Sequence, residues 1–72
     1  MINYRVCKTN KDQHLGHNDF NNEKEAEAYA LKNSLYNEDF IYELKMKFED
    51  GEDDDCYQVI SYFRQGQKTV DI

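Results

Sequence analysis

The strongest constraint on the fold is residues 40–48, where large apolar side chains alternate with mostly charged ones. The apolar members of this stretch are Phe40, Tyr42, Leu44, Met46 and Phe48. Because successive side chains of a β-strand point to opposite faces, a period of two predicts a strand that is buried on one face. Residues 57–64 are rich in β-branched and aromatic side chains and predict a returning strand, so that the two strands form a hairpin.

The turn between these two strands is strongly acidic and carries the net charge of the protein. Asp50-Gly51 supplies the turn itself. Six of the 15 acidic residues of the chain lie in this turn, and the other nine balance nine basic residues, so the net charge of −6 can be assigned to one loop. The six are Glu49, Asp50, Glu52, Asp53, Asp54 and Asp55. This distribution disfavours direct binding to nucleic acid or an anionic membrane and favours a basic protein surface as the partner.

The N-terminal segment predicts one more strand, and a short segment follows the hairpin. Residues 2–9 alternate apolar and polar side chains, as a strand does, whereas residues 10–19 have no apolar period and predict a loop. Residues 65–67 predict a turn, and residues 68–72 form either a tail or a short edge strand.

A helix is predicted to begin after Asn22, which can cap its first turn, and to run to about residue 33 or 36. Ala26 and Ala30 share one face, and their small side chains allow close contact with strands. Leu31 and Leu35 lie on another face, so we expect them over a sheet edge, under a loop or against another molecule.

These elements predict a single small α+β domain over residues 1–72, with the order β-α-β-β. One helix covers one face of a three-stranded, mainly antiparallel sheet. Because crossover connections are right-handed, we expect the first two strands to run parallel with the third between them. The open face then presents a mixed basic and apolar surface, made of Arg5, Cys7, Lys45, Lys47, Ile60, Tyr62 and Arg64.

Within that open face, Ile60 and Tyr62 are expected to be exposed together. An exposed aliphatic and aromatic pair favours a protein contact or a homodimer interface. A platform for single-stranded nucleic acid is the alternative, but Glu43 and the acidic turn weigh against it.

Four residues could bind a metal ion. If the first and third strands are neighbours, Cys7 and Cys56 come close, and His14 and His17 lie in the following loop. Two thiolates and two imidazoles can hold zinc in tetrahedral geometry, but the spacing matches no standard zinc finger. The same residues offer a thiol–imidazole pair without an oxyanion element, so we predict neither an enzyme nor a bound cofactor.

The helix start at residues 20–30, FNNEKEAEAYA, resembles that of many small α/β proteins, including short accessory proteins of phages and mobile elements. The resemblance implies a protein that binds a host enzyme stoichiometrically, as some anti-restriction and anti-CRISPR proteins do by imitating the charge of nucleic acid. This chain departs from a full nucleic-acid mimic because its acids are concentrated in one turn. The residues that could extend the acidic patch are Glu23, Glu27, Glu38 and Asp39.

Together these features predict a non-catalytic, cytoplasmic inhibitor that occupies a basic, nucleic-acid-binding surface of a host protein. The six acids of the turn, with Ile60 and Tyr62, form the predicted contact. No membrane span or signal peptide is recognisable, and two cysteines fit a reducing compartment. The alternatives are a homodimer that forms through Ile60 and Tyr62 or through Leu31 and Leu35, a small zinc protein, and a turn that only keeps the protein soluble.

Overall fold

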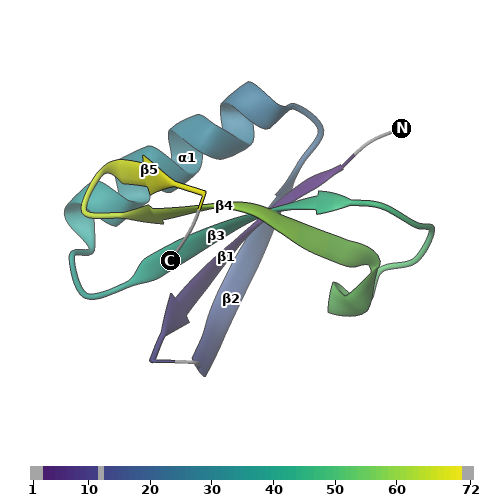
Figure 1. The fold of residues 1–72 in the computed structure, drawn as a ribbon, viewed down its shortest axis with the longest axis horizontal. Helices are drawn as coiled ribbons and strands as arrows, with labels where there is room; N and C mark the ends of the chain where they lie inside the picture. Colours follow the sequence, from purple (N-terminus) through teal and green to yellow (C-terminus); the bar gives the residue numbers. More distant parts are fainter. Residues whose placement is uncertain (1–2, 12, 71–72) are drawn as a thin grey trace.

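A computed structural model describes residues 3–11 and 13–70, which form a five-stranded antiparallel sheet with one helix across one face (Figure 1). The elements in chain order are β1 (Tyr4–Asn10), β2 (Gln13–Phe20), α1 (Glu23–Tyr36), β3 (Ile41–Lys47), the 3₁₀ helix η1 (Asp54–Cys56), β4 (Tyr57–Arg64) and β5 (Gln67–Thr69). The α+β class and the β3–β4 hairpin are confirmed. The expected three-stranded β-α-β-β arrangement is wrong, because the sheet contains β2 and β5 as well.

The segment that the sequence predicted to be a loop, residues 10–19, contains most of strand β2. β2 forms an antiparallel hairpin with β1, in which Arg5 lies opposite Asp19 and Tyr4 opposite Phe20. No residue of β2 is buried, because the strand lies at the edge of the sheet. A polar edge strand lacks the alternation that marks a half-buried strand, which explains why the sequence did not reveal it.

The strand order is β2-β1-β3-β4-β5, so β3 is the central strand. β1 and β3 are antiparallel neighbours, and the expectation of parallel strands on either side of a third is wrong. The reason is the β1–β2 hairpin, which reverses the chain before α1 and thereby reverses the direction in which β3 approaches β1. β1 and β4 are consequently separated by β3.

The core lies between α1 and the sheet face that it covers. Val6, Leu44 and Phe63, from the three central strands, are each at most 1% exposed. They pack with Tyr42 against the helix, whose small Ala26 and Ala30 face the sheet as predicted. Of the apolar side chains in residues 40–48, Phe40, Tyr42 and Leu44 belong to this packing, whereas Phe48 is 55% exposed beyond the end of β3.

The two ends of α1 are fixed in different ways. At its start the side-chain oxygen of Asn22 accepts hydrogen bonds from the backbone N–H groups of Lys24 and Glu25, which confirms the predicted cap. Near its end the hydroxyl oxygen of Ser34 accepts a hydrogen bond from the N–H of Gly66, and Leu35 packs against the same glycine. Leu35 therefore lies over the sheet edge at the β4–β5 turn, whereas Leu31 packs against the core. α1 is too short and too polar to cross a membrane, and the described residues contain no longer helix.

A β-bulge in β4 changes which of its side chains face the helix. Leu44 lies opposite Ser61, but the next residue of β3, Lys45, lies opposite Val59. Ile60 is therefore an extra residue without an opposite partner, and the alternation along β4 reverses at this position.

Because of this reversal, the predicted faces of β4 are wrong in part. Ile60 packs against the core on the helix side, together with Phe63. Tyr57 and Tyr62 face the open side, since they lie opposite Lys47 and Glu43 of β3. The expected pair of Ile60 and Tyr62 on one exposed face does not form.

Candidate functional site

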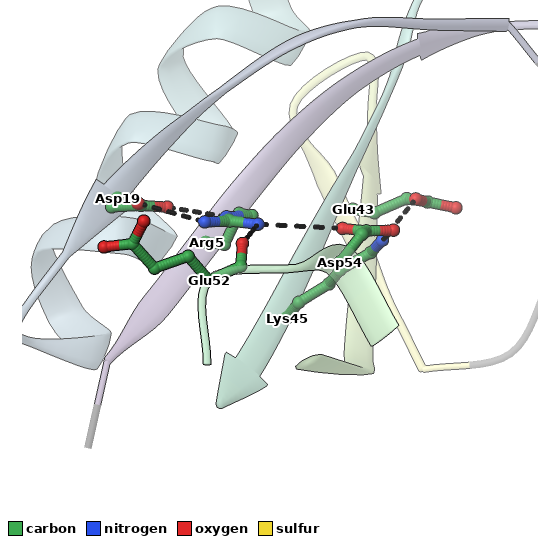
Figure 2. Close-up of polar contacts among 6 residues, drawn as sticks. All are labelled: Arg5, Asp19, Glu43, Lys45, Glu52 and Asp54. Carbon is green, nitrogen blue, oxygen red and sulfur yellow. Dashed lines mark hydrogen bonds and ion pairs between the residues drawn. The ribbon is translucent and has the colours of Figure 1, made fainter. Parts of the chain in front are cut away.

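The acidic loop (residues 49–55) does not project entirely into solvent, because Asp54 folds back onto the sheet face that α1 leaves open (Figure 2). The Lys45 Nζ donates a hydrogen bond of 2.6 Å to Oδ2 of Asp54. The Arg5 Nη1 lies 4.0 Å from Oδ1 of the same carboxylate and donates a hydrogen bond of 3.4 Å to the backbone oxygen of Glu52. Cations from two neighbouring strands, β1 and β3, thus hold the loop to the sheet.

Arg5 is the centre of this network. Its Nε and Nη2 donate hydrogen bonds of 2.7 and 3.2 Å to the two carboxylate oxygens of Asp19 on β2, a bidentate arrangement. The guanidinium carbon lies 4.1 Å from the centre of the Tyr57 ring, in cation–π geometry. Figure 2 shows the guanidinium group between Asp19 and Asp54.

The cations beneath the loop are buried, contrary to the expectation of an open basic surface. Arg5 is 6% exposed, Lys45 opposite it on β3 is 8% exposed, and Cys7, the next residue of β1 on this face, is fully buried. A buried cation is tolerated only when it is paired, which the carboxylates of Asp19, Asp54 and Glu43 achieve here. Two cations that the sequence placed on an open surface thus serve to fix the loop.

These contacts shift the pKa values of the charged groups. The hydrogen bonds from Arg5 hold the pKa of Asp19 below its ordinary value, and the hydrogen bond from Lys45 does the same for Asp54. Burial by itself would lower the pKa of Lys45, but the hydrogen bond to Asp54 and the surrounding negative charge outweigh it and raise this pKa. The pairs are therefore ionised at neutral pH.

The geometry of the loop itself depends on Gly51 and Cys56. Gly51 has φ of +139°, and a β-carbon at this position would lie 2.6 Å from the sulfur of Cys56. The N–H of Cys56 donates to the backbone oxygen of Asp53 at 2.9 Å, and the N–H of Phe48 donates to that of Cys56 at 2.9 Å. The acidic loop is thus a compact, closed structure that packs on its own cysteine.

The remaining acids of the loop face solvent. They are Glu49, Asp50, Glu52, Asp53 and Asp55. Among residues 3–11 and 13–70, none of these five carboxylates takes part in an ion pair, whereas Asp54 takes part in two. Five of the six carboxylates predicted for partner binding are thus available, and the sixth has a structural role.

The alternative in which Cys7, His14, His17 and Cys56 converge on zinc depended on β1 and β4 being neighbours, and they are not. β3 separates β1, which carries Cys7, from the residue that precedes β4. The two histidine rings stack on each other on β2, with centroids 5.6 Å apart. Across the part of the chain that the structure describes, no group of three or more His, Cys, Asp or Glu residues is placed to hold a metal ion.

The thiol of Cys7 is not placed for nucleophilic chemistry either. It is fully buried, and burial raises its pKa to about 11. The thiolate, rather than the thiol, is the nucleophile and the metal ligand, so this group is inert at neutral pH.

Next to Asp54, the open face continues into a shallow depression of about 480 Å³. Its lining includes Tyr62, His14, Lys11 and Glu43, which combine an aromatic ring with both signs of charge. Tyr62 therefore lies beside the anchored loop, whereas Ile60 is on the opposite face of the sheet. The role of these two residues in partner binding stays a prediction.

Sequence reasoning missed Asp19, which holds Arg5 from β2. Residues 10–19 were predicted to be a loop, so the carboxylate of Asp19 was not expected beside the sheet. The sequence did contain an indication of this contact. Arg5 and Lys45 lie on the same face of their predicted strands, and a cation on a covered face needs an acidic residue beside it.

Comparisons of the chain with protein-family models, with curated proteins and with solved structures found no match. The fold and the site define a small acidic α+β protein in which an anionic loop is fixed in place by buried cations. The arrangement presents a concentration of negative charge to solvent at a fixed place on the sheet.

Proposed function

We propose that the protein is a non-catalytic binding module whose acidic loop occupies a basic, nucleic-acid-binding surface of a host protein. The observation that supports this proposal is that the carboxylates of the loop have two different roles. Asp54 is engaged with Lys45 and Arg5, while the other five carboxylates are exposed and face solvent without a counter-ion in the described chain.

The anchoring of the loop supports the proposal because it lowers the cost of binding. A segment that is ordered before it meets its partner loses less conformational entropy on association than a flexible one. The contacts of Gly51, Cys56 and Asp54 provide this order. Concentrated charge also steers the approach of a basic partner, most strongly at low salt.

The position of other acids limits the size of the charged surface. Glu38 and Asp39 lie in the connection between α1 and β3, at the opposite end of the sheet from η1 (Figure 1). They therefore do not extend the acidic patch, and the proposed contact is a single anionic projection rather than a long row of phosphate-like charges. In this proposal the protein acts stoichiometrically, as an inhibitor of the anti-CRISPR or anti-restriction kind made by a phage or mobile element.

The test compares two variants that remove the same charge from opposite ends of the molecule. Asp53→Asn/Asp55→Asn neutralises two exposed carboxylates of the loop, and Glu38→Gln/Asp39→Asn is the matched control. Each immobilised protein is used to capture proteins from a lysate of the host cell at about 0.05 M and about 0.5 M salt, with and without added DNA or RNA.

We expect the loop variant to capture less of the partner and to show a flatter dependence on salt, while the control behaves like the original protein. Added nucleic acid should compete with capture, because it occupies the same basic surface. Equal capture by both variants, or capture that nucleic acid does not reduce, would contradict the proposal.

A further inference from the structure

The outer edge of β2 is an unpaired backbone surface of the sheet in the described chain. β2 is an eight-residue strand at the end of the strand order, and in the described chain no strand pairs with its outer side. Edge strands are usually protected by proline, by lysine or by a covering segment, since their free N–H and C=O groups can pair with another strand. β2 contains neither proline nor lysine.

One end of β2 is interrupted, which limits where a further strand could pair. Lys8 lies opposite Gly16, but the next residue of β1, Thr9, lies opposite His14, so Leu15 is bulged. The part of the edge that follows the bulge is therefore Gly16–Phe20, in which Gly16 itself has φ of +136°.

We infer that two copies of the protein pair through this edge, around a two-fold axis at Asn18, to form one continuous sheet. In this antiparallel register His17 of each copy lies opposite Asp19 of the other. Gly16 of each copy likewise lies opposite Phe20 of the other. The inference goes beyond the proposed function, because it uses neither the acidic loop nor its partner.

The faces of the strand agree with this register. His17 and Asp19 lie opposite Cys7 and Arg5 of β1 and therefore share the open face of the sheet. An imidazole opposite a carboxylate can donate a hydrogen bond to it, and such cross-strand polar pairs stabilise antiparallel strands. The Asp19 side chain is still 50% exposed while it accepts hydrogen bonds from Arg5, so a second donor can reach it.

On the helix side, the glycine offers room for the aromatic ring. A β-carbon at Gly16 would meet nothing within 4 Å. A depression of about 190 Å³ adjoins this residue, and its lining includes Val6, Leu15 and Tyr29. The Phe20 ring of a second copy would cover the glycine and enclose apolar surface there, as aromatic residues do when they face an edge glycine.

The neighbouring registers are worse for electrostatic reasons. An axis at His17 places the two copies of this histidine opposite each other, and an axis at Asp19 does the same with two carboxylates. Two opposed carboxylates destabilise strand pairing, and the axis at His17 leaves Asp19 without an imidazole opposite it. The axis at Asn18 brings an imidazole opposite a carboxylate at both symmetric positions instead, so the edge is complementary to itself.

The first test is sedimentation equilibrium from about 10 µM to about 1 mM, a range that detects weak dimers. His17→Glu places carboxylates opposite Asp19 at two symmetric positions and should weaken the dimer about ten-fold or more. His14→Glu is the matched control, because His14 lies before the bulge and has no opposite residue in β2 of the second copy. A monomer over the whole range, or equal weakening by both variants, would overturn the inference.

The second test determines which residues of the two β2 strands lie opposite each other. Asn18→Cys places two thiols across the axis, and oxidation by diamide, which takes up the two hydrogens, should join them in a disulfide-linked dimer. Gln67→Cys, on exposed β5, is the control, and the native Cys7 and Cys56 are buried. Equal cross-linking of both variants would contradict the register. Asp53→Asn/Asp55→Asn should dimerise like the original protein, so failure here is distinct from failure of the proposed function.

Discussion

Arg5 and Lys45 decide how the acidic loop sits on the protein. Both are charged side chains on the face of the sheet that has no helix, and each is more than nine-tenths buried. Burial of a cation is unfavourable unless an anion accompanies it. Asp54 supplies that anion to both residues. One carboxylate of the loop therefore has a structural role, while the neighbouring carboxylates form no ion pair within the described residues.

Replacement of Asp54 by Asn should therefore destabilise the protein, because Lys45 loses its closest counter-ion and Arg5 loses one of two. We expect a loss of about 1 kcal/mol in the free energy of unfolding, a modest value because the Asp54 side chain is 58% exposed and water screens the pair. Urea denaturation measures this. Asp53→Asn is the control and should change stability by less than about 0.5 kcal/mol; an equal loss in both variants would show that Asp54 is no anchor.

The sequence could predict that the turn is acidic but not which acid is paired. Six carboxylates in seven residues are equivalent in a one-dimensional pattern. The choice of Asp54 depends on η1, which turns that residue back toward β1 and β3. Tertiary geometry determines which carboxylate is paired, and the neighbouring residues in the sequence do not indicate it.

Among the elements, those with one buried face were predictable and those at the edges were not. β3 alternates clearly because one side lies on the core, and α1 was located from its cap and its small residues. β2 has no buried residue and is mostly polar, so its composition resembled a loop. The bulge at Ile60 was also hidden, since an extra residue in a strand leaves its composition unchanged while it reverses the faces beyond it.

The acidic loop, as an element, depends on one glycine. Gly51→Ala should destabilise the protein by more than Gly16→Ala, by about 1 kcal/mol or more, when both are measured by urea denaturation of dilute protein. Both glycines have φ near +140°, so both substitutions strain the backbone. Only at Gly51 would the new β-carbon also collide with Cys56. Equal losses would mean that the loop relaxes around the added methyl group.

For the whole molecule, the charge network links stability to acid. The pKa values of Asp19 and Asp54 are lowered in the folded protein, so the unfolded chain binds more protons when the pH falls. Their contribution to stability is complete above the ordinary carboxyl pKa of about 4 and is lost as the pH falls through the lower folded values.

The prediction is a fall in the urea midpoint between about pH 5 and about pH 2. Asp19→Asn/Asp54→Asn should be less stable at neutral pH and show a smaller fall, because these two carboxylates no longer titrate. If the urea midpoints of the variant and the original protein fall by the same amount with pH, groups other than Asp19 and Asp54 cause the loss of stability in acid.

The strand order also has a kinetic consequence for the whole chain. All five strands belong to local units, since β1 pairs with β2 and β4 pairs with both β3 and β5, each across a short connection. Within the sheet, the ladder between β1 and β3 joins these units, and its partners, such as Val6 and Leu44, are far apart in sequence. Closure of that long loop costs entropy before the contacts form, so the late event in folding should be the docking of the β1–β2 hairpin onto the β3–β4–β5 unit.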